Sequence, residues 1–326
     1  MKSGVLVRLS ILALFCCVGI PSTGLAASTL VAWGRNDSGQ ASMPTGSNFI
    51  SVAGGGSFTL ALKADGSIAG WGDNSLSEIT TPNGHNFKSI AAGSNFSLAL
   101  TTDGSIVGWG NNSIGQIGVP SGSGYTAISA GRGQGLAIKS DGSLVGWGAD
   151  DYHQADVPTG NTYKAVAAGG WHSVALRTDG SLIAWGSDLH GETNVPTGND
   201  FTAIAAGYCH SVALRSDGSV VAWGQNLYGE ANAPTGNNFV AVAAGRYYSL
   251  AIKSNGSVVA WGNNMYGASN VPSGLFASSI SAGWDHAIAI TAVPEPSCFL
   301  VLTLGLALSV FLISKRRIAC SDGTLH

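Results

Sequence analysis

The stretch AAGYCHSVALRSDGSVVAWGQN, residues 205–226, shows how this chain is built from short strands. His210 to Arg215 and Ser219 to Trp223 are mainly apolar runs of five or six residues. Asp217-Gly218 between them predicts a hairpin turn, because both residues tolerate a positive φ. A further run, Phe201 to Gly207, precedes them. Runs this short, bounded by glycine, predict antiparallel strands rather than helices.

The same pattern recurs at a fixed interval of 38 residues along the chain. A proline series from Pro44 to Pro272 and a glycine series from Gly55 to Gly283 keep this phase. A repeat of this length is typical of solenoids and propellers. The clearest mark of the repeat is a Trp-Gly pair, whose tryptophans are Trp33, Trp71, Trp109, Trp147, Trp185, Trp223 and Trp261.

The two ends of the repeat array favour a closed ring over a solenoid. The seventh copy ends at Ile290 without its third strand, and Thr29 to Trp33 has the sequence of that missing strand. A solenoid needs polar capping repeats, which this array lacks, whereas a ring removes the open edges. We therefore predict an all-β fold, a seven-bladed β-propeller over residues 28–291 that is closed by the N-terminal strand. Three or four strands per blade remain possible.

The charge of the repeat region argues against a nucleic-acid partner. Residues 28–297 contain ten basic and seventeen acidic side chains, a net charge of −7, whereas nucleic-acid surfaces need clustered Lys and Arg. Cys209 is the single cysteine of this region and has no partner there for a disulfide. We expect a monomeric propeller that is stabilised by packing.

Both ends of the chain contain segments of the kind that direct export. Residues 1–27 read as a signal peptide, with a charged start, the apolar run Leu9 to Ile20, and small residues before a cleavage site. Residues 292–297 form a linker that contains Pro294, Glu295 and Pro296.

An apolar run, 298–314, follows this linker and is predicted to be one C-terminal transmembrane helix. The tail, 315–326, begins with Lys315, Arg316 and Arg317, which marks the cytoplasmic side. We predict export to the cell envelope or surface, or secretion after sorting. The C-terminal helix would lie in the inner membrane before processing.

Two parts of the chain resemble known families. The pattern at 205–226 resembles the regulator-of-chromosome-condensation repeat, in a compact form similar to the bacterial type-II β-lactamase-inhibitory protein. The resemblance implies a seven-bladed propeller and leaves the function open, because related propellers act in nucleotide exchange, inhibition and binding. The C-terminal order of Pro-Glu-Pro, apolar run and basic residues is similar to a PEP-CTERM sorting signal. That resemblance implies an exosortase-type protease as a partner.

Residues that differ between the copies fall at one end of the predicted blades. Because the strands alternate in direction, the turn after the first strand and the start of the loop after Trp-Gly share one face. Aromatic and arginine side chains, typical of binding hot spots, gather at these variable positions. The predicted binding residues are Arg132, Tyr152, Trp171, Tyr208, Tyr228, Arg246, Tyr247, Tyr266, Trp284 and Asp285.

The sequence contains no convincing catalytic motif, and we expect no cofactor and no metal. His172, His210 and His286 share one repeat position with Phe58 and Phe96, which indicates packing with a polar edge. The Asp-Gly turns fit hairpins better than calcium sites. The Asn/Asp series from Asn36 to Asn264 predicts Asx turns.

The leading hypothesis is a binding or scaffold propeller that recognises a protein or an exopolysaccharide through this aromatic-rich face. Two alternatives stay open at this point. One is an extracellular glycan lyase or hydrolase that uses Asp151, Asp188 or Asp285 and needs two carboxyls in one cleft. The other is a protein inhibitor of a secreted or periplasmic enzyme such as β-lactamase.

Overall fold

The computed structural model describes residues 28–291. The predicted signal peptide, linker, sorting helix and basic tail lie outside the described residues. Within 28–291, no helix is long and apolar enough to cross a membrane.

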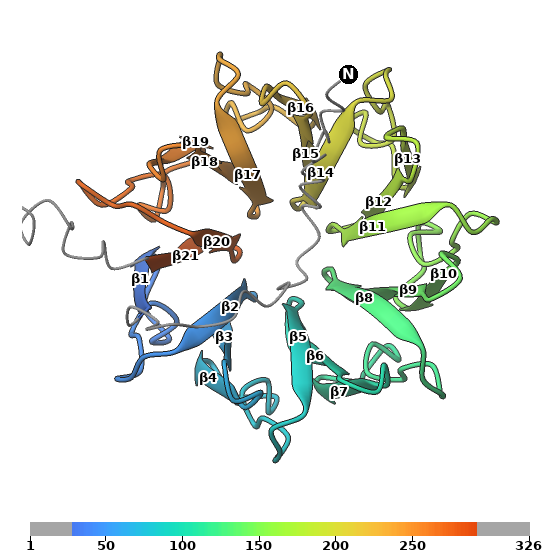
Figure 1. The fold of residues 1–326 in the computed structure, drawn as a ribbon, viewed down its shortest axis with the longest axis vertical. Coiled ribbons are helices and arrows are strands. Elements are labelled where there is room, and N and C mark those ends of the chain that lie inside the picture. Colours follow the sequence, from blue (N-terminus) through green and yellow to red (C-terminus); the bar gives the residue numbers. More distant parts are fainter. Residues whose placement is uncertain (1–27, 292–326) are drawn as a thin grey trace, which may run out of the picture.

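The described residues form seven antiparallel sheets of three strands, arranged as blades around a central channel (Figure 1). Blades 1 to 3 contain β2 (Phe49–Gly54), β3 (Phe58–Lys63), β4 (Ile68–Gly72); β5 (Phe87–Ala92), β6 (Phe96–Thr101), β7 (Ile106–Gly110); and β8 (Tyr125–Ala130), β9 (Gln134–Lys139), β10 (Leu144–Gly148). Blades 4 to 6 contain β11 (Tyr163–Ala168), β12 (His172–Arg177), β13 (Leu182–Gly186); β14 (Phe201–Ala206), β15 (His210–Arg215), β16 (Val220–Gly224); and β17 (Phe239–Ala244), β18 (Tyr248–Lys253), β19 (Val258–Gly262). Blade 7 contains β20 (Ser279–Ala282), β21 (His286–Thr291) and β1 (Thr29–Gly34).

Blade 7 confirms the predicted ring closure. β1 pairs antiparallel with β21 in an unbroken register from Thr29 opposite Thr291 to Gly34 opposite His286. β21 also pairs with β20, so the first strand of the propeller is the outer strand of its last blade. Strands from the two ends of the repeat region therefore complete one sheet, and each blade has three strands.

The apolar core is divided among the interfaces between neighbouring blades. A representative cluster joins Val174 and Leu176 of blade 4 to Phe201 and Trp223 of blade 5. The indole N–H of each Trp-Gly tryptophan from Trp71 to Trp261 also donates to a loop carbonyl 31 residues earlier, as Trp223 does to Glu192 at 2.9 Å. Trp33 bonds to Ala268 across the ring closure. Burial of a large apolar side chain contributes about 2–3 kcal/mol, so these residues hold adjacent blades together.

The Asp-Gly turns differ from the predicted geometry. Glycine alone takes a positive φ, +83° at Gly218, while Asp217 keeps a negative one. Gly218 N bonds to Arg215 O, and Arg215 N bonds to Ser219 O. This pattern is a type I turn followed by a glycine bulge, and only one residue of that turn needs the left-handed region. The Asp217 carboxylate accepts from Ser219 N at 2.8 Å, which explains an aspartate before the glycine.

The Asn/Asp series does not form the predicted Asx turns. Asn226 Oδ1 accepts from Ala231 N, five residues later, and Asp188 Oδ1 accepts from Thr193 N in the same way. An Asx turn instead joins residues two apart. These side chains therefore bridge the whole loop after Trp-Gly and fix its shape.

Hydrogen bonds between loop and turn confirm that both lie at the same end of each blade. Ser187 N donates to Trp171 O, and Gln225 N donates to Cys209 O, each at 2.8 Å. Equivalent bonds occur in the other blades, as from Asn263 N to Tyr247 O. We call this end of the propeller the turn face. The opposite end contains the Asp-Gly turns.

Candidate functional site

The central channel is lined mainly by small residues of the inner strands. β2, β5, β8, β11, β14, β17 and β20 surround a cavity of about 270 Å³, with Ala, Ser, Val and Ile side chains on its wall. At the turn face the remaining space falls to about 70 Å³. The side chains of the turns cause this narrowing.

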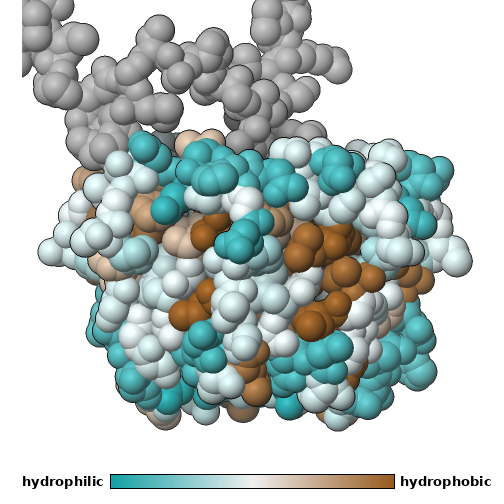
Figure 2. All heavy atoms as spheres, turned by 90° about the horizontal axis from the view of Figure 1, so that it is seen from below, coloured by the Kyte–Doolittle hydropathy of each residue, from teal (hydrophilic) through white to brown (hydrophobic). Residues whose placement is uncertain are grey.

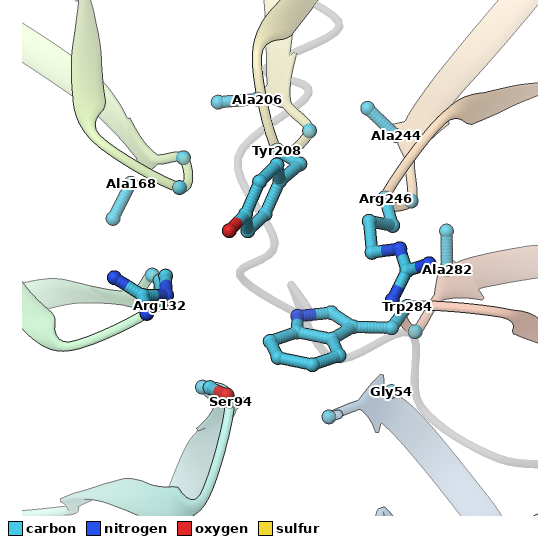
Figure 3. Close-up of a pocket in the computed structure, with 18 of the residues that line it drawn as sticks. Gly54, Ser94, Arg132, Ala168, Ala206, Tyr208, Ala244, Arg246, Ala282 and Trp284 are labelled. Atoms are coloured by element: carbon cyan, nitrogen blue, oxygen red, sulfur yellow. The ribbon is translucent and has the colours of Figure 1, made fainter. Parts of the chain in front are cut away.

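Residues at one repeat position surround the channel opening at the turn face. We call the residues at this repeat position the mouth ring; they are Gly56, Ser94, Arg132, Gly170, Tyr208, Arg246 and Trp284, and all except Gly56 line the opening. Backbone bonds link them to neighbouring turns around the circle, as from Tyr208 N to Arg246 O, Arg246 N to Trp284 O, and Trp284 N to Gly55 O. Arg132, Tyr208, Arg246 and Trp284 extend over the opening (Figure 3). The backbone ring repeats, while its side chains differ.

Aromatic contacts extend from the mouth ring outward across the turn face. Trp171 lies 4.6 Å from Tyr208 between ring centroids and 5.9 Å from Tyr152. Tyr208 also contacts Trp284 at 6.2 Å and Tyr247 at 5.7 Å. Tyr228 lies 5.5 Å from Tyr247. Six aromatic side chains from five blades thus form one connected set.

Arginine side chains pack on this aromatic set. Arg132 lies over the Trp171 ring at 5.3 Å, and Arg246 lies over both Tyr247 and Trp284, at 5.0 and 5.7 Å. Contacts of this type are worth about 0.5–2 kcal/mol and increase as water is removed. The arginines therefore help to hold the aromatic rings in place.

Asp285 connects the remaining predicted residues. Its carboxylate lies 3.7 Å from Arg246 and 3.7 Å from Arg35, and Arg35 in turn lies over the Tyr266 ring at 4.9 Å. Burial raises the pKa of the Asp285 carboxyl, while the two arginines act in the opposite direction. All ten predicted binding residues thus join one network, with Arg35 as the link to Tyr266. We call these eleven residues the aromatic–arginine cluster; that they bind a partner stays a prediction.

Exposed aliphatic side chains stand in the loops after Trp-Gly and were not singled out from the sequence. Leu189, Leu227 and Met265 occupy one repeat position and are 70%, 74% and 73% exposed. Ile114 and Leu76 stand one residue further along in their own repeats. Seen from the rim, apolar residues form separate patches between polar zones (Figure 2). Comparing the seven copies position by position would have found these residues, because scaffold positions do not vary in this way.

The carboxylates of the enzyme alternative have different surroundings. Asp188 accepts from Thr193 N in its own loop, Asp285 lies between two arginines, and Asp151 lines a separate pocket. The contacts in residues 28–291 do not bring two of these carboxylates together. Acid–base chemistry with paired carboxyls needs such a pair.

The three histidines at the shared repeat position are buried and connect neighbouring blades. Nε2 of His172 lies 2.7 Å from Ser211 Oγ, and Nε2 of His210 lies 2.8 Å from Ser249 Oγ. His286 makes the same contact with Thr59 across the ring closure, at 2.9 Å. Burial lowers the pKa values of His172 and His286 to about 4 and that of His210 to about 3. The predicted packing position with a polar edge is therefore confirmed.

Two groups of side chains have spacings that a metal ion could use. His190, Glu192 and Cys209 form one group, and Asp150, His153 and Asp156 form the other, which is exposed. Burial, with Glu192 and Glu230 nearby, raises the pKa of the Cys209 thiol to about 12. A thiol that keeps its proton is a poor ligand and a poor nucleophile. The expected absence of a metal and a cofactor stays a prediction.

Comparison with known families identifies the repeat. The regulator of chromosome condensation (RCC1) repeat matches residues 49–77, 87–116, 163–192, 201–230 and 239–268. No curated protein matches the chain. Five stretches of the chain therefore match the RCC1 repeat, and its fold is an RCC1-like propeller.

Solved structures share this fold at low sequence identity. Prp20p from Saccharomyces cerevisiae, studied for its binding to Gsp1p and histones, has a TM-score of 0.71 at 18% identity, over 87% of this chain and 96% of that one. Yeast RCC1 (Prp20) bound to Kap60 has a TM-score of 0.70 at 20% identity, over 83% and 90%. Human WBSCR16 has a TM-score of 0.67 at 18% identity, over 83% and 100%. Identities this low show a common fold and do not transfer a partner. The predicted similarity to the β-lactamase-inhibitory protein stays a prediction.

Proposed function

We propose that this chain is an exported, non-catalytic binding module, which recognises a protein partner through the aromatic–arginine cluster. The observation that carries the proposal is that all ten predicted residues, from different copies of the repeat, join one network at one end of the ring. Tyr, Trp and Arg dominate protein-binding hot spots because they bury a large area and keep a polar group available. Exposed Leu227 and Met265 beside the cluster add apolar surface that a partner could cover.

Two further observations support this reading. The RCC1-like structures that resemble the chain include one studied for binding to Gsp1p and histones and one bound to Kap60. Within residues 28–291, the contacts do not pair Asp151, Asp188 or Asp285, the carboxylates of the enzyme alternative, with one another. Export and anchoring rest on the signal peptide and the sorting segment in the sequence, which would hold the turn face outside the cell.

The repeat itself supplies variants that test the proposal with little risk to folding. Ser94 and Gly56 occupy the mouth-ring positions of Tyr208 and Trp284 in blades 2 and 1. The double variant Tyr208→Ser, Trp284→Gly therefore gives two blades turns that this scaffold already contains. Val240→Thr serves as the control. Val240 is 51% exposed at the opposite end of β17, and Thr202 holds its position in blade 5.

The immobilised chain is used to capture proteins from the envelope and medium of the source cells, and captured proteins are quantified by mass spectrometry. We expect that the wild type and Val240→Thr capture the same protein and retain it equally. The double variant should retain it at least about thirtyfold more weakly, since a hot-spot residue contributes about 2 kcal/mol or more. Equal retention by all three chains would refute the cluster as the binding site.

A further inference from the structure

A pocket of about 290 Å³ lies on the turn face beside the aromatic–arginine cluster, and the protein-binding proposal does not use it. The loops and turns of blades 2 and 3 and the turn of blade 4 form its walls. Its lining residues include Asn95, Asn111, Gln116, Asp151, Gln154 and Trp171. Arg132, Ile114, Gly133 and Ala149 complete most of the remaining wall. The pocket is mostly polar and has one aromatic side.

Two lining residues of the pocket, both in blade 3, are small compared with their counterparts in the other blades. Gly133 stands where other blades have larger residues, including Trp171, Tyr247 and Asp285. At the second position blade 3 has Ala149, and the other blades have Arg35, Asp73, Asn111, Ser187, Gln225 and Asn263. Ala149 is the smallest side chain of that set, and Gly133 has none. The hollow is therefore a property of this blade and not of the repeat.

The loop after β1 has a long side chain at the position of Ala149. Comparison of the two loops shows which polar groups of blade 3 lack a partner as a result. In the loop after β1, Arg35 donates to the Asp37 carboxylate, and Gln40 Nε2 also bonds to Asp37. The corresponding residues of blade 3 are Ala149, Asp151 and Gln154. Blade 3 therefore has no arginine at the position of Arg35, and no side chain from that position pairs with the Asp151 carboxylate. Within residues 28–291, the Asp151 carboxylate has no hydrogen-bond or ion-pair partner.

Two buried glutamines add unpaired donors to the pocket. Gln154 is 1% exposed and Gln116 is 3% exposed, and both line the pocket. Their Oε1 atoms accept from Tyr152 N and Ile114 N. Neither Nε2 atom has a partner among the described residues. Both Nε2 atoms are open to the pocket, so a polar ligand that enters it can accept hydrogen bonds from them.

The charge and chemistry of the lining select the class of ligand. Arg132 and Asp151 balance each other, which does not favour a phosphate group or another strongly charged ligand. Asparagine and glutamine amides both donate and accept, as sugar hydroxyls do. The Trp171 indole offers an apolar side of the kind on which the C–H face of a sugar ring packs.

The volume of the pocket fits one sugar residue. At about 30 Å³ per water molecule, the pocket holds on the order of ten waters, and a hexose has a similar number of heavy atoms. We propose that this pocket binds one neutral hexose residue, through the amides of Gln116 and Gln154, the Asp151 carboxylate and the Trp171 indole. The proposal does not depend on a protein partner, although Arg132 and Trp171 belong to both sites.

Ala149→Arg is the variant that tests the pocket. Arg35 occupies this position beside Asp37, so an arginine at 149 can pair with Asp151 and fill the space without a new backbone shape. Ala149→Asn is a smaller second variant, because Asn111 and Asn263 occupy the same repeat position. Asn263→Arg is the charge-matched control, since Asn263 does not line the pocket.

The full-length chain is purified in a detergent without a sugar headgroup and titrated by calorimetry and ligand-observed NMR. The probes are glucose, galactose and mannose, each free and as the terminal residue of a neutral oligosaccharide. We expect the wild type and Asn263→Arg to bind at least one probe equally. Ala149→Arg should weaken binding about tenfold or more, and Ala149→Asn to a smaller extent, while circular dichroism stays unchanged.

The outcomes of this experiment distinguish free hexose from an oligosaccharide end as the ligand. They also distinguish failure of the sugar proposal from failure of the protein-binding proposal. Binding of free hexose, or of an oligosaccharide end alone, supports the site and shows which source fills it. Absence of binding to every probe, or equal binding by Ala149→Arg, would overturn the proposal. Loss of protein capture in Ala149→Arg without any sugar binding would instead assign the pocket to the protein site. Loss of capture in Tyr208→Ser, Trp284→Gly tests the protein proposal independently.

Discussion

Ser77 and His153 take a backbone shape that glycine takes in the other five repeats. Their φ angles are +68° and +62°, and Gly39 and Gly115 have +81° and +80° at the same position. A side chain in the left-handed region costs about 1–2 kcal/mol. This cost concerns the backbone alone, since a Cβ at Gly39 or Gly115 would meet no atom within 4 Å.

We therefore expect His153→Gly to stabilise the propeller by about 0.5–1 kcal/mol. Relief of the left-handed strain exceeds the greater freedom that glycine gives the unfolded chain. The exposed contact of His153 with Asp156 contributes little, because surface ion pairs are weak. Urea denaturation measures the change, and Gly115→His should lower stability by a similar amount. A loss of stability in His153→Gly would contradict the strain at this residue.

The buried histidines predict how stability depends on pH. Because the folded pKa values of His172, His210 and His286 lie near 4, 3 and 4, below the ordinary 6.5, the unfolded chain takes up protons first as the pH falls. Their neutral forms stabilise the fold fully above about pH 6.5, and this contribution falls between pH 6.5 and about 4. Each histidine contributes a slope of about 1.4 kcal/mol per pH unit.

The variant His210→Phe should flatten this slope by about one third. Phenylalanine already fills the position in blades 1 and 2, where Phe58 and Phe96 are buried. Urea denaturation at several pH values between 4 and 7 gives the slope for both chains. Parallel curves for the wild type and the variant would show that His210 does not titrate on unfolding.

Some of these residue-scale features could be predicted from the sequence and others could not. Mixed His and Phe occupancy indicated packing at one position, because a shared site must suit both side chains. The sequence did not indicate that the Asn226 carboxamide reaches Ala231. Whether such a side chain bonds to the backbone N–H two residues later or five residues later depends on the shape of the loop. The pocket at Ala149 could not be predicted either. It depends on a side chain that is smaller than those at the same position in the other copies, and no sequence motif indicates such a pocket.

At the scale of secondary structure, ring closure depends on one short strand. β1 has six residues and pairs only with β21, yet it fills the outer edge of blade 7. Its Leu30 and Trp33 belong to the core clusters on the two sides of that blade. The closure was predictable because the N-terminal segment carries the same Trp-Gly mark as the other outer strands.

A disulfide across this closure should stabilise the ring. Thr29 and Thr291 are paired residues at the end of the β1–β21 register, and their hydroxyl oxygens lie 2.6 Å apart. The double variant Thr29→Cys, Thr291→Cys should oxidise readily and raise the unfolding free energy by about 3–5 kcal/mol, because the cross-link closes a very long loop. Denaturation with and without a reductant measures the gain. A pair that does not oxidise, or that gives no gain, would argue against this register.

For the whole molecule, the seven copies separate scaffold from variable surface. The Trp-Gly strands, the loop bridges and the backbone ring at the mouth recur in nearly every blade. Blades 1 and 2 contribute Gly56 and Ser94 to the mouth ring, whereas blades 5 to 7 contribute Tyr208, Arg246 and Trp284. The turn face is therefore chemically uneven around the axis. The sequence could place the variable residues on one face, but only the closed ring brings blades 3 to 7 into a single network.

The most direct measurement of the central claim is photo-cross-linking from two matched positions. A benzophenone amino acid replaces Tyr228, 50% exposed in the aromatic–arginine cluster, or Val240, 51% exposed at the opposite end of the propeller. Each chain is expressed in the source cells, irradiated and analysed for covalent adducts. We predict one dominant protein adduct from position 228 and none of that protein from position 240. The same adduct from both positions, or only from 240, would contradict recognition through the turn face.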